Sequence, residues 1–289
     1  MKKQCVYGEA ELKTVQQFQL ECLKEIIRVC EKVGVEYFVM GGTSLGAVRH
    51  GGFIPWDDDI DVGMTRSNYE KFLKLAPAEF SPRYELQTPY SERAMPYFYS
   101  KVRINGTKLV EYCARKLKIN HGIYVDVFPF DVVPDDEAAC RRQFERVQKL
   151  LLELRLRQMP DVSLEPKGVG AVLRAAFRKL PHWYYNLFPL ASLHRKLERE
   201  MTRYDGQEHQ ALACLIFPVY KKEYLKKSEL YPIGRMKFED VTVCVPGNIE
   251  AYLRTHYGDY HQLPPVEERY GHQKYICEID LPQPDGGAE

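Results

Sequence analysis

The stretch GGFIPWDDDIDVGM, residues 51–64, places four aspartates among the apolar residues of an expected core strand. Aspartate is a poor strand former, and burying its carboxylate is costly unless the charge is paired or binds a metal ion. Side chains two positions apart in a strand share one face, so Asp59 and Asp61 are expected to project together. A divalent cation relieves the repulsion between two adjacent carboxylates. We therefore expect a metal site on a strand from Asp57 to Met64; the alternative is a solvated turn followed by a strand that starts at Ile60.

A pair of glycines lies upstream of the aspartates. Residues 36–40 are typical of a buried strand, and residues 43–52 are typical of a short helix with Thr43 or Ser44 as its cap. Glycines between them let a ligand approach the backbone, and the amides at a helix N-terminus favour phosphate. The pattern predicts a phosphate-binding turn formed by Gly41, Gly42, Thr43 and Ser44.

This order of strand, Gly-Gly turn, helix and D-x-D strand resembles the layout of the nucleotidyltransferase fold. In that fold the turn holds a phosphate chain and the aspartates hold metal, and a third carboxylate is expected from a later strand. Asp126 stands alone in the apolar run YVDVF (124–128) and is the candidate. The alternative is a carboxylate at a strand edge that pairs with an arginine.

The rest of the chain predicts a mixed α/β (α+β) core. Amphipathic helices are expected over residues 9–32 and 65–80, and strands over 84–88, 97–104 and 122–130. After Pro134 the pattern is helical to about residue 204, and it is followed by a strand at 241–246, a helix at 248–258 and a Pro-rich tail. We predict one catalytic domain over residues 1–289, with a nucleotidyltransferase-like mixed sheet, a helical insertion over 135–215 and the core resuming to 289.

Composition excludes several classes of protein. Hydrophobic content of 45% and charged content of 28% are ordinary for a soluble globular chain, and a formal net charge of +1 gives no reason to expect nucleic-acid binding. The eight cysteines are scattered, which favours reduced thiols in a cytoplasmic protein. We expect neither a secretory signal nor a membrane span, because no run approaches the ~18 apolar residues that a span needs.

Residues 41–64 closely resemble the signature of the LicD family, whose relatives include fukutin and fukutin-related protein. The resemblance continues through KVRINGT (101–107), GIYVDVFPFD (122–131) and residues 238–265, and it skips residues 140–215. The tail departs from the family pattern, because His272-Gln273 stands where a pair of histidines is expected.

The resemblance implies transfer of a phosphorylated alcohol from a CDP-linked donor to a hydroxyl of a cell-surface glycan, or of its lipid-linked precursor, with release of CMP. Phosphocholine from CDP-choline is the first expectation, and ribitol phosphate is the second. Two Mg²⁺ or Mn²⁺ ions on Asp59, Asp61 and Asp126 would serve both ends of such a displacement. The alternatives are a nucleotidyltransferase that adds a nucleotide to a small molecule, and an inactive glycan-binding relative.

Other polar and aromatic residues lie near these motifs in the sequence. Arginine suits bidentate contact with phosphate, so Arg49, Lys101 and Arg103 are expected to bind phosphate, against ordinary ion pairs as the alternative. Trp56 is a candidate for stacking on cytosine, against packing in the core. The remaining candidates for supporting roles are His50, Asp57, Asp58 and His121, the last against a loop-capping role.

The predicted helical insertion is basic. Residues 141–203 hold 14 Lys/Arg and 6 Asp/Glu. The segment RAAFRKLPHWYYNLFPLASLHRKL, residues 174–197, mixes basic with aromatic and aliphatic residues, as segments at a membrane surface do. Two interpretations stay open for this stretch: a solvated charged face, and peripheral contact with the inner face of the membrane.

Overall fold

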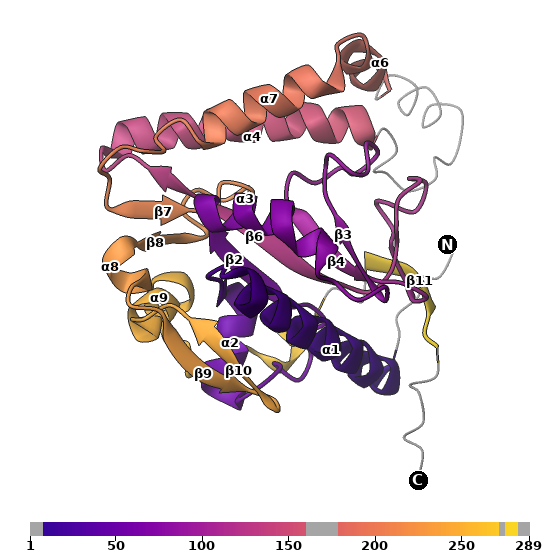
Figure 1. Ribbon diagram of the computed structural model, residues 1–289, viewed down its shortest axis with the longest axis vertical. Coiled ribbons are helices and arrows are strands. Elements are labelled where there is room, and N and C mark those ends of the chain that lie inside the picture. The colour runs from indigo at the N-terminus through magenta and orange to yellow at the C-terminus, as the bar shows by residue number, and fades with distance from the viewer. Residues whose placement is uncertain (1–7, 160–178, 272–274, 283–289) are drawn as a thin grey trace.

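The structure is a computed structural model that describes residues 8–159, 179–271 and 275–282. Its centre is a seven-stranded mixed sheet with the order β1-β2-β6-β4-β3, to which β7 and β8 are added beside β6 (Figure 1). The strands are β1 Phe38–Val39, β2 Asp61–Thr65, β3 Tyr84–Gln87, β4 Ser100–Ile104, β6 Tyr124–Val133, β7 Ala211–Ala213 and β8 Tyr224–Lys226. This architecture confirms the predicted α+β fold class.

A parallel pair lies in the middle of the sheet. β2 and β6 run parallel, and the other pairings that the structure describes in this sheet are antiparallel. Because side chains alternate along a strand, Val62 and Val127 face one side of the sheet, and Asp61 and Asp126 face the other. The valine side packs against α1 Glu9–Val33 and α3 Arg66–Leu75, which the 3-10 turn η1 Ala76–Ala78 follows.

On the aspartate side of the sheet, a second group of elements covers the part of β6 that follows Asp126. Phe128 and Phe130 of β6 share a buried cluster with Leu230 of α8 Lys227–Leu230 and with Tyr252 of α9 Ile249–Tyr257. The hairpin of β9 Gly234–Phe238 and β10 Val241–Val245 lies beside α2 Gly41–His50 (Figure 1). These elements lie around the aspartates.

Three helices pack together at one end of the molecule (Figure 1). They are α4 Glu137–Gln158, α6 Leu180–Asn186 and α7 Leu190–Met201. Leu154 of α4 and Leu197 of α7 belong to one buried cluster, which also contains Ala211 of β7. The helical stretch expected over 135–215 is therefore helical in its described part to Met201, while Ala211–Ala213 is a strand of the main sheet.

The end of the chain returns to the core. After the short 3-10 turn η2 Val266–Glu268, β11 Ile276–Asp280 pairs antiparallel with β5 Lys108–Glu111. The sequence predicted a Pro-rich tail here and no strand, because the pairing of β11 depends on the distant strand β5. Within the described ranges, no helix is both long and apolar enough to cross a membrane, and the seven cysteines there carry free thiols.

Two predicted boundaries near the aspartates are wrong. The strand starts at Asp61 and not at Asp57, because only from Asp61 onward does the chain pair with β6. Helix α2 starts at Gly41 with Met40 as its N-cap, so neither Thr43 nor Ser44 caps it. Their hydroxyls serve the neighbouring backbone instead: Oγ1 of Thr43 accepts from the Asp61 N–H, and Oγ of Ser44 donates to the Val39 carbonyl.

Candidate active site

Asp61 and Asp126 lie side by side on the parallel strands β2 and β6. The strand register pairs these two residues directly. The backbone of Asp61 is fixed at both ends, because its N–H donates to Oγ1 of Thr43 at 2.9 Å and its carbonyl accepts from the Met40 N–H at 3.1 Å. The start of α2 is thereby joined to the start of β2, and the first turn of the helix adjoins the aspartates.

The surroundings of the Asp61 carboxyl are strongly acidic. Burial raises its pKa well above the ordinary value, and Asp59, Asp126, Asp57 and Glu223 raise it further. Although the residue keeps partial contact with the surface, the neighbouring negative charges oppose its ionisation. Such a carboxyl group favours a bound cation.

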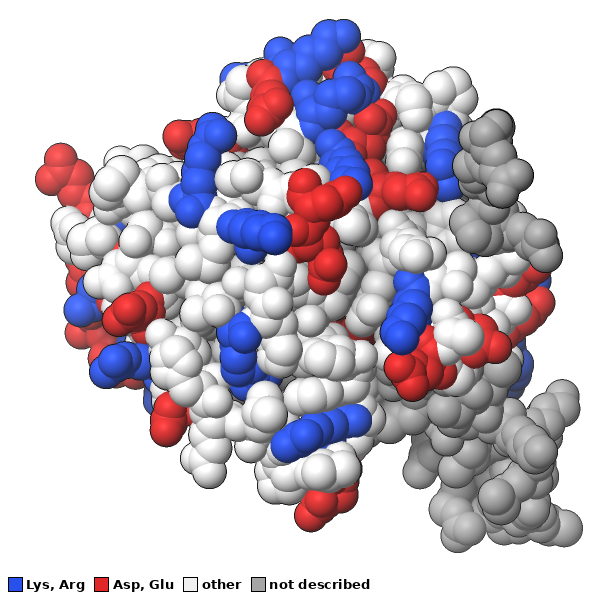
Figure 2. All heavy atoms as spheres, turned by 90° about the horizontal axis from the view of Figure 1, so that it is seen from below, with Lys and Arg blue, Asp and Glu red and all other residues white. Residues whose placement is uncertain are grey.

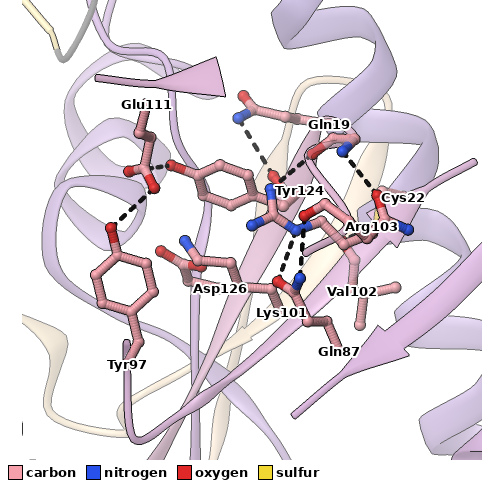
Figure 3. Close-up of polar contacts among 12 residues, drawn as sticks. Gln19, Cys22, Gln87, Tyr97, Lys101, Val102, Arg103, Glu111, Tyr124 and Asp126 are labelled. Carbon is pink, nitrogen blue, oxygen red and sulfur yellow. Dashed lines mark hydrogen bonds and ion pairs between the residues drawn. The ribbon is translucent and has the colours of Figure 1, made fainter. Parts of the chain in front are cut away.

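Asp126 has a cationic partner within the protein. Its Oδ1 lies 2.7 Å from Nζ of Lys101, and both side chains are almost completely buried. Burial raises the pKa of Asp126 to about 6, although Lys101 acts in the opposite direction. Lys101 was expected to bind phosphate, and the structure places its ammonium against the carboxylate (Figure 3).

Arg103 also points into the protein. Its Nε donates to Oε1 of Gln87 at 2.8 Å and its Nη1 donates to the Gly122 carbonyl at 2.7 Å (Figure 3). The guanidinium lies over the ring of Tyr124, 4.5 Å from the centroid. These contacts are consistent with the burial of Arg103, which is only 2% exposed.

Glu111 of β5 completes this polar cluster. It accepts hydrogen bonds from the hydroxyls of Tyr97 at 3.0 Å and of Tyr124 at 3.2 Å (Figure 3). Burial alone would raise the pKa of Glu111, but the nearby Lys101 and Arg103 lower it below the ordinary value. The cluster therefore holds two acidic groups, Glu111 and Asp126, and two basic groups, Lys101 and Arg103.

The loop that carries Asp57, Asp58 and Asp59 is held by α1. Nε2 of Gln16 donates to the Asp57 carbonyl at 2.8 Å, and Nε2 of Gln19 donates to the Asp58 carbonyl at 2.7 Å. The sequence did not identify these glutamines, because in an amphipathic helix they read as ordinary polar positions. Their role follows only from the docking of α1 against the loop.

Asp57 and Asp58 occupy different places. Oδ2 of Asp57 lies 2.7 Å from the position that a Cβ of Gly42 would take, at the N-terminal turn of α2. The buried Asp58 packs its carboxylate against Gly271 of the C-terminal segment. The acidic loop is thus in contact with α1, α2 and the end of the chain.

Gly41 lies close to Asp61 and to three further residues, Glu223, Tyr252 and Tyr257. Its φ of +54° is a left-handed conformation, and its N–H donates to the Tyr252 hydroxyl at 2.8 Å. That hydroxyl donates to Oε2 of Glu223 at 2.5 Å. A Cβ on Gly41 would lie 3.3 Å from Oδ2 of Asp61 and 3.9 Å from both Oε1 of Glu223 and the Tyr257 hydroxyl.

The sequence did not predict Glu223, Tyr252 or Tyr257. Glu223 lies in the charged stretch YKKEYLKK (220–227), which has the composition of an exposed segment. In the structure Glu223 is buried, and burial raises its pKa to about 7. No local pattern could reveal this, because β8 and α9 bring these residues to Gly41.

The other predicted residues lie around the edge of the site. Nη1 of Arg49 donates to the Tyr260 carbonyl at 3.1 Å, and its buried Nε has no partner within the described ranges. The Trp56 ring has the Arg269 guanidinium 5.4 Å from its centroid and the His50 ring 6.4 Å away. His121 is held in the loop before β6 by a 3.1 Å contact with the Leu117 carbonyl.

The donor chemistry suits a hard cation such as Mg²⁺ or Mn²⁺, since carboxylate oxygens dominate the site. In the described part of the chain, however, no three side chains of His, Cys, Asp or Glu converge closely enough to hold a metal ion. One oxygen of Asp126 is also bonded to Lys101. The face of the molecule seen from below mixes acidic and basic side chains (Figure 2).

A helix N-terminus joined to paired aspartates on a mixed sheet defines a nucleotidyltransferase-type site. Residues 34–165, which contain α2, the acidic loop and Asp126, match the LicD/FKTN/FKRP nucleotidyltransferase domain. This part of the chain is therefore a LicD-family domain.

The curated relatives that match the chain include two kinds of transferase. It is 26% identical over 270 residues to the lipopolysaccharide cholinephosphotransferase LicD of Haemophilus influenzae, and this match covers 90% of the chain and 96% of that protein. It is 30% identical over 110 residues to the human ribitol 5-phosphate transferase FKRP, over 38% of the chain and 20% of that protein. The mouse FKRP is 29% identical over the same length.

Proposed function

We propose that this protein is a metal-dependent phosphotransferase. It moves a phosphorylated alcohol, with phosphocholine as the first candidate, from a CDP-linked donor to a hydroxyl of a cell-surface glycan or its lipid-linked precursor. CMP is released. The observation that carries the proposal is the direct pairing of Asp61 with Asp126 beside the first turn of α2, in a chain that matches a cholinephosphotransferase over nearly its whole length.

The reaction forms one bond and breaks one bond at the same phosphorus. An oxygen of the acceptor attacks the phosphorus that carries the alcohol, and the bond from this phosphorus to the bridging oxygen of CMP breaks. The proton of the acceptor hydroxyl must leave. Asp126 is the proposed proton acceptor, because it is the carboxylate directly beside Asp61 on the neighbouring strand.

Asp59 and Asp61, together with Asp126, are the proposed ligands of Mg²⁺ or Mn²⁺. A bound ion of this kind supplies positive charge where the diphosphate bridge breaks. We propose that the backbone amides of Gly42 and Thr43 donate hydrogen bonds to the phosphates of the CDP-linked donor, because the first amides of a helix lack partners within the helix. Arg49 lies at the C-terminal end of α2, and we propose that its guanidinium binds the part of the CDP-linked donor that lies farthest from the aspartates.

Product analysis tests the proposal directly. The full chain is incubated with CDP-choline, CDP-ribitol, CDP-glycerol or CDP-ethanolamine, with Mg²⁺ or Mn²⁺ and a glycan acceptor. Release of CMP with transfer of the labelled alcohol is the expected result. Release of pyrophosphate from a nucleoside triphosphate in place of CMP would favour the nucleotidyltransferase alternative. Absence of any turnover with all four CDP-linked donors would contradict the proposed function.

We also propose that α6 brings the enzyme to the membrane surface that carries a lipid-linked acceptor. Large apolar side chains of this segment are exposed: Leu180, Trp183, Tyr184, Leu187 and Phe188. No acidic residue occurs between Lys179 and Leu197, which suits an anionic lipid surface. Arg174 and Arg178, which the sequence also assigned to this surface, lie outside the described residues.

A further inference from the structure

Lys101 is a buried cation next to the candidate active site. Its side chain is 0% exposed. Besides Asp126, three tyrosine rings surround the ammonium, with centroids 3.4 Å from Nζ for Tyr124, 5.2 Å for Tyr97 and 5.3 Å for Tyr99. Ring faces attract a cation most strongly when water is excluded. The lysine is therefore a fixed part of the site and not a mobile surface group.

The charges around Lys101 are balanced within the protein. Lys101 and Arg103 both act on Glu111, and Lys101 is bonded to Asp126. The tyrosines connect these groups, since Tyr97 and Tyr124 donate to Glu111 while their rings face Lys101. Asp126 thus has a positive partner without any metal ion.

Asp61 has the opposite surroundings. The groups near its Oδ2 are acidic or neutral, because a Cβ on Gly41 would lie 3.3 Å from this oxygen and 3.9 Å from both Oε1 of Glu223 and the Tyr257 hydroxyl. Its neighbour Asp126 is the residue at the same level of the next strand. The two aspartates are therefore unequal: the Asp126 side of the site already contains a cation, and the Asp61 side favours one from solution.

We propose that Lys101 takes the place of a second metal ion, so that each chain binds one divalent cation. Two-metal sites hold their ions about 3.5–4 Å apart, and a carboxylate between the ions offers one oxygen to each. An ammonium 2.7 Å from Oδ1 of Asp126 uses one of these oxygens. Lys101 is then a positioning residue that fixes and neutralises Asp126. This inference rests on the proposed metal-dependent function, and it replaces the two ions expected from the sequence.

The stoichiometry of Mn²⁺ binding tests the inference without turnover. Free Mn²⁺ is measured by electron paramagnetic resonance while the full chain is titrated in the presence of saturating CDP. We expect one tight Mn²⁺ per chain for the wild type. Lys101→Met keeps the length of the side chain but removes the ammonium, and we expect it to bind two. Lys108→Met is the matched control, because Lys108 also pairs with a carboxylate, Glu278, but lies exposed at the edge strand β5; it should bind one.

The outcomes separate this inference from the proposed function. Two tight ions on the wild type would overturn the inference and leave the metal-dependent function in place, and this measurement does not depend on the folding of any variant. One ion on a folded Lys101→Met chain would also overturn it, since Lys101 would not be what excludes the second ion. No Mn²⁺ binding to the wild type would refute the metal-dependent function, and the inference with it.

Discussion

Asp61 and Asp126 occupy facing positions on two parallel strands, yet only Asp126 is bonded to a buried lysine. Two carboxylates that are equivalent in the sequence pattern therefore differ in their electrostatic surroundings. The pKa of Asp61 is raised by burial and by other carboxylates, while Lys101 limits the rise for Asp126. This difference leads to opposite effects on stability for two chemically identical substitutions.

We predict that Asp61→Asn and Asp126→Asn both abolish CMP release but change stability in opposite directions. In metal-free buffer at neutral pH, Asp61→Asn should raise the free energy of unfolding, because it removes a carboxyl group whose ionisation is favoured in the unfolded chain and opposed by burial and by its neighbours in the folded chain. Asp126→Asn should lower it by about 3–5 kcal/mol, because the Lys101 ammonium is left buried without its carboxylate. Denaturant unfolding measures both effects.

A double variant provides the control for this prediction. Adding Lys101→Met to Asp126→Asn removes the unpaired ammonium, so most of the lost stability should return. If the double variant is as unstable as Asp126→Asn alone, the ion pair is not the cause of the loss. Near-wild-type CMP release by either single variant would remove that aspartate from the chemistry.

Glu223 is expected to make stability depend on pH. Burial raises its pKa from 4.5 to about 7, so between these values the folded chain holds a proton that the unfolded chain has lost. The stabilising contribution is complete below pH 4.5 and disappears as the pH rises through 7, which amounts to about 3 kcal/mol at most. Unfolding free energies measured from pH 5 to pH 8 should therefore fall less steeply for Glu223→Gln than for the wild type. The exposed Glu208→Gln is the control, and an unchanged slope for Glu223→Gln would show that Glu223 does not titrate in this range.

Gly41→Ala should impair donor binding beyond the cost of backbone strain. Gly41 and Gly106 both have positive φ, +54° and +79°, so an alanine at either position costs roughly 1–2 kcal/mol in conformation. Only at Gly41 does the new Cβ approach Asp61 and Glu223, while nothing lies within 4 Å at Gly106. Calorimetry with CDP-choline and Mg²⁺ should show weakened binding for Gly41→Ala and unchanged binding for Gly106→Ala. Equal affinities would place the start of α2 outside the donor site.

The exposed apolar side chains of α6 and of the residues directly after it should bind anionic vesicles. Trp183 and Leu187 are 59% and 79% exposed, and burying such a side chain contributes about 1.5–3 kcal/mol. Replacing both with serine should reduce co-sedimentation with phosphatidylglycerol vesicles more than tenfold and leave transfer to a short soluble acceptor intact. Serine at Val219 and Val266, which are 60% and 71% exposed elsewhere, is the matched control. A wild-type protein that stays in the supernatant at low salt would contradict the membrane proposal.

The local sequence was sufficient for much of the fold and for part of the site. Helical periodicity predicted α1 to within a few residues and the start of the helical stretch that contains α4, because each helix buries one continuous stripe. The isolated aspartate in YVDVF indicated a polar position in a buried strand, and the spacing of the glycines before the acidic run indicated a nucleotidyltransferase layout. These features depend on neighbours in the chain, and they are also what the resemblance to the LicD family rests on.

The tertiary structure decided how the polar residues divide their roles. Strand register set Lys101 against Asp126, and the packing of β8 and α9 brought Glu223 and Tyr252 to Gly41. Burial then separated the pKa values of carboxylates that look alike in the sequence. Local patterns determine which face of a strand or helix a residue occupies, whereas its charge partners are set by chain segments that meet only on folding. For that reason the sequence alone determined that carboxylates gather here, and only the fold determined which of them already has a cation.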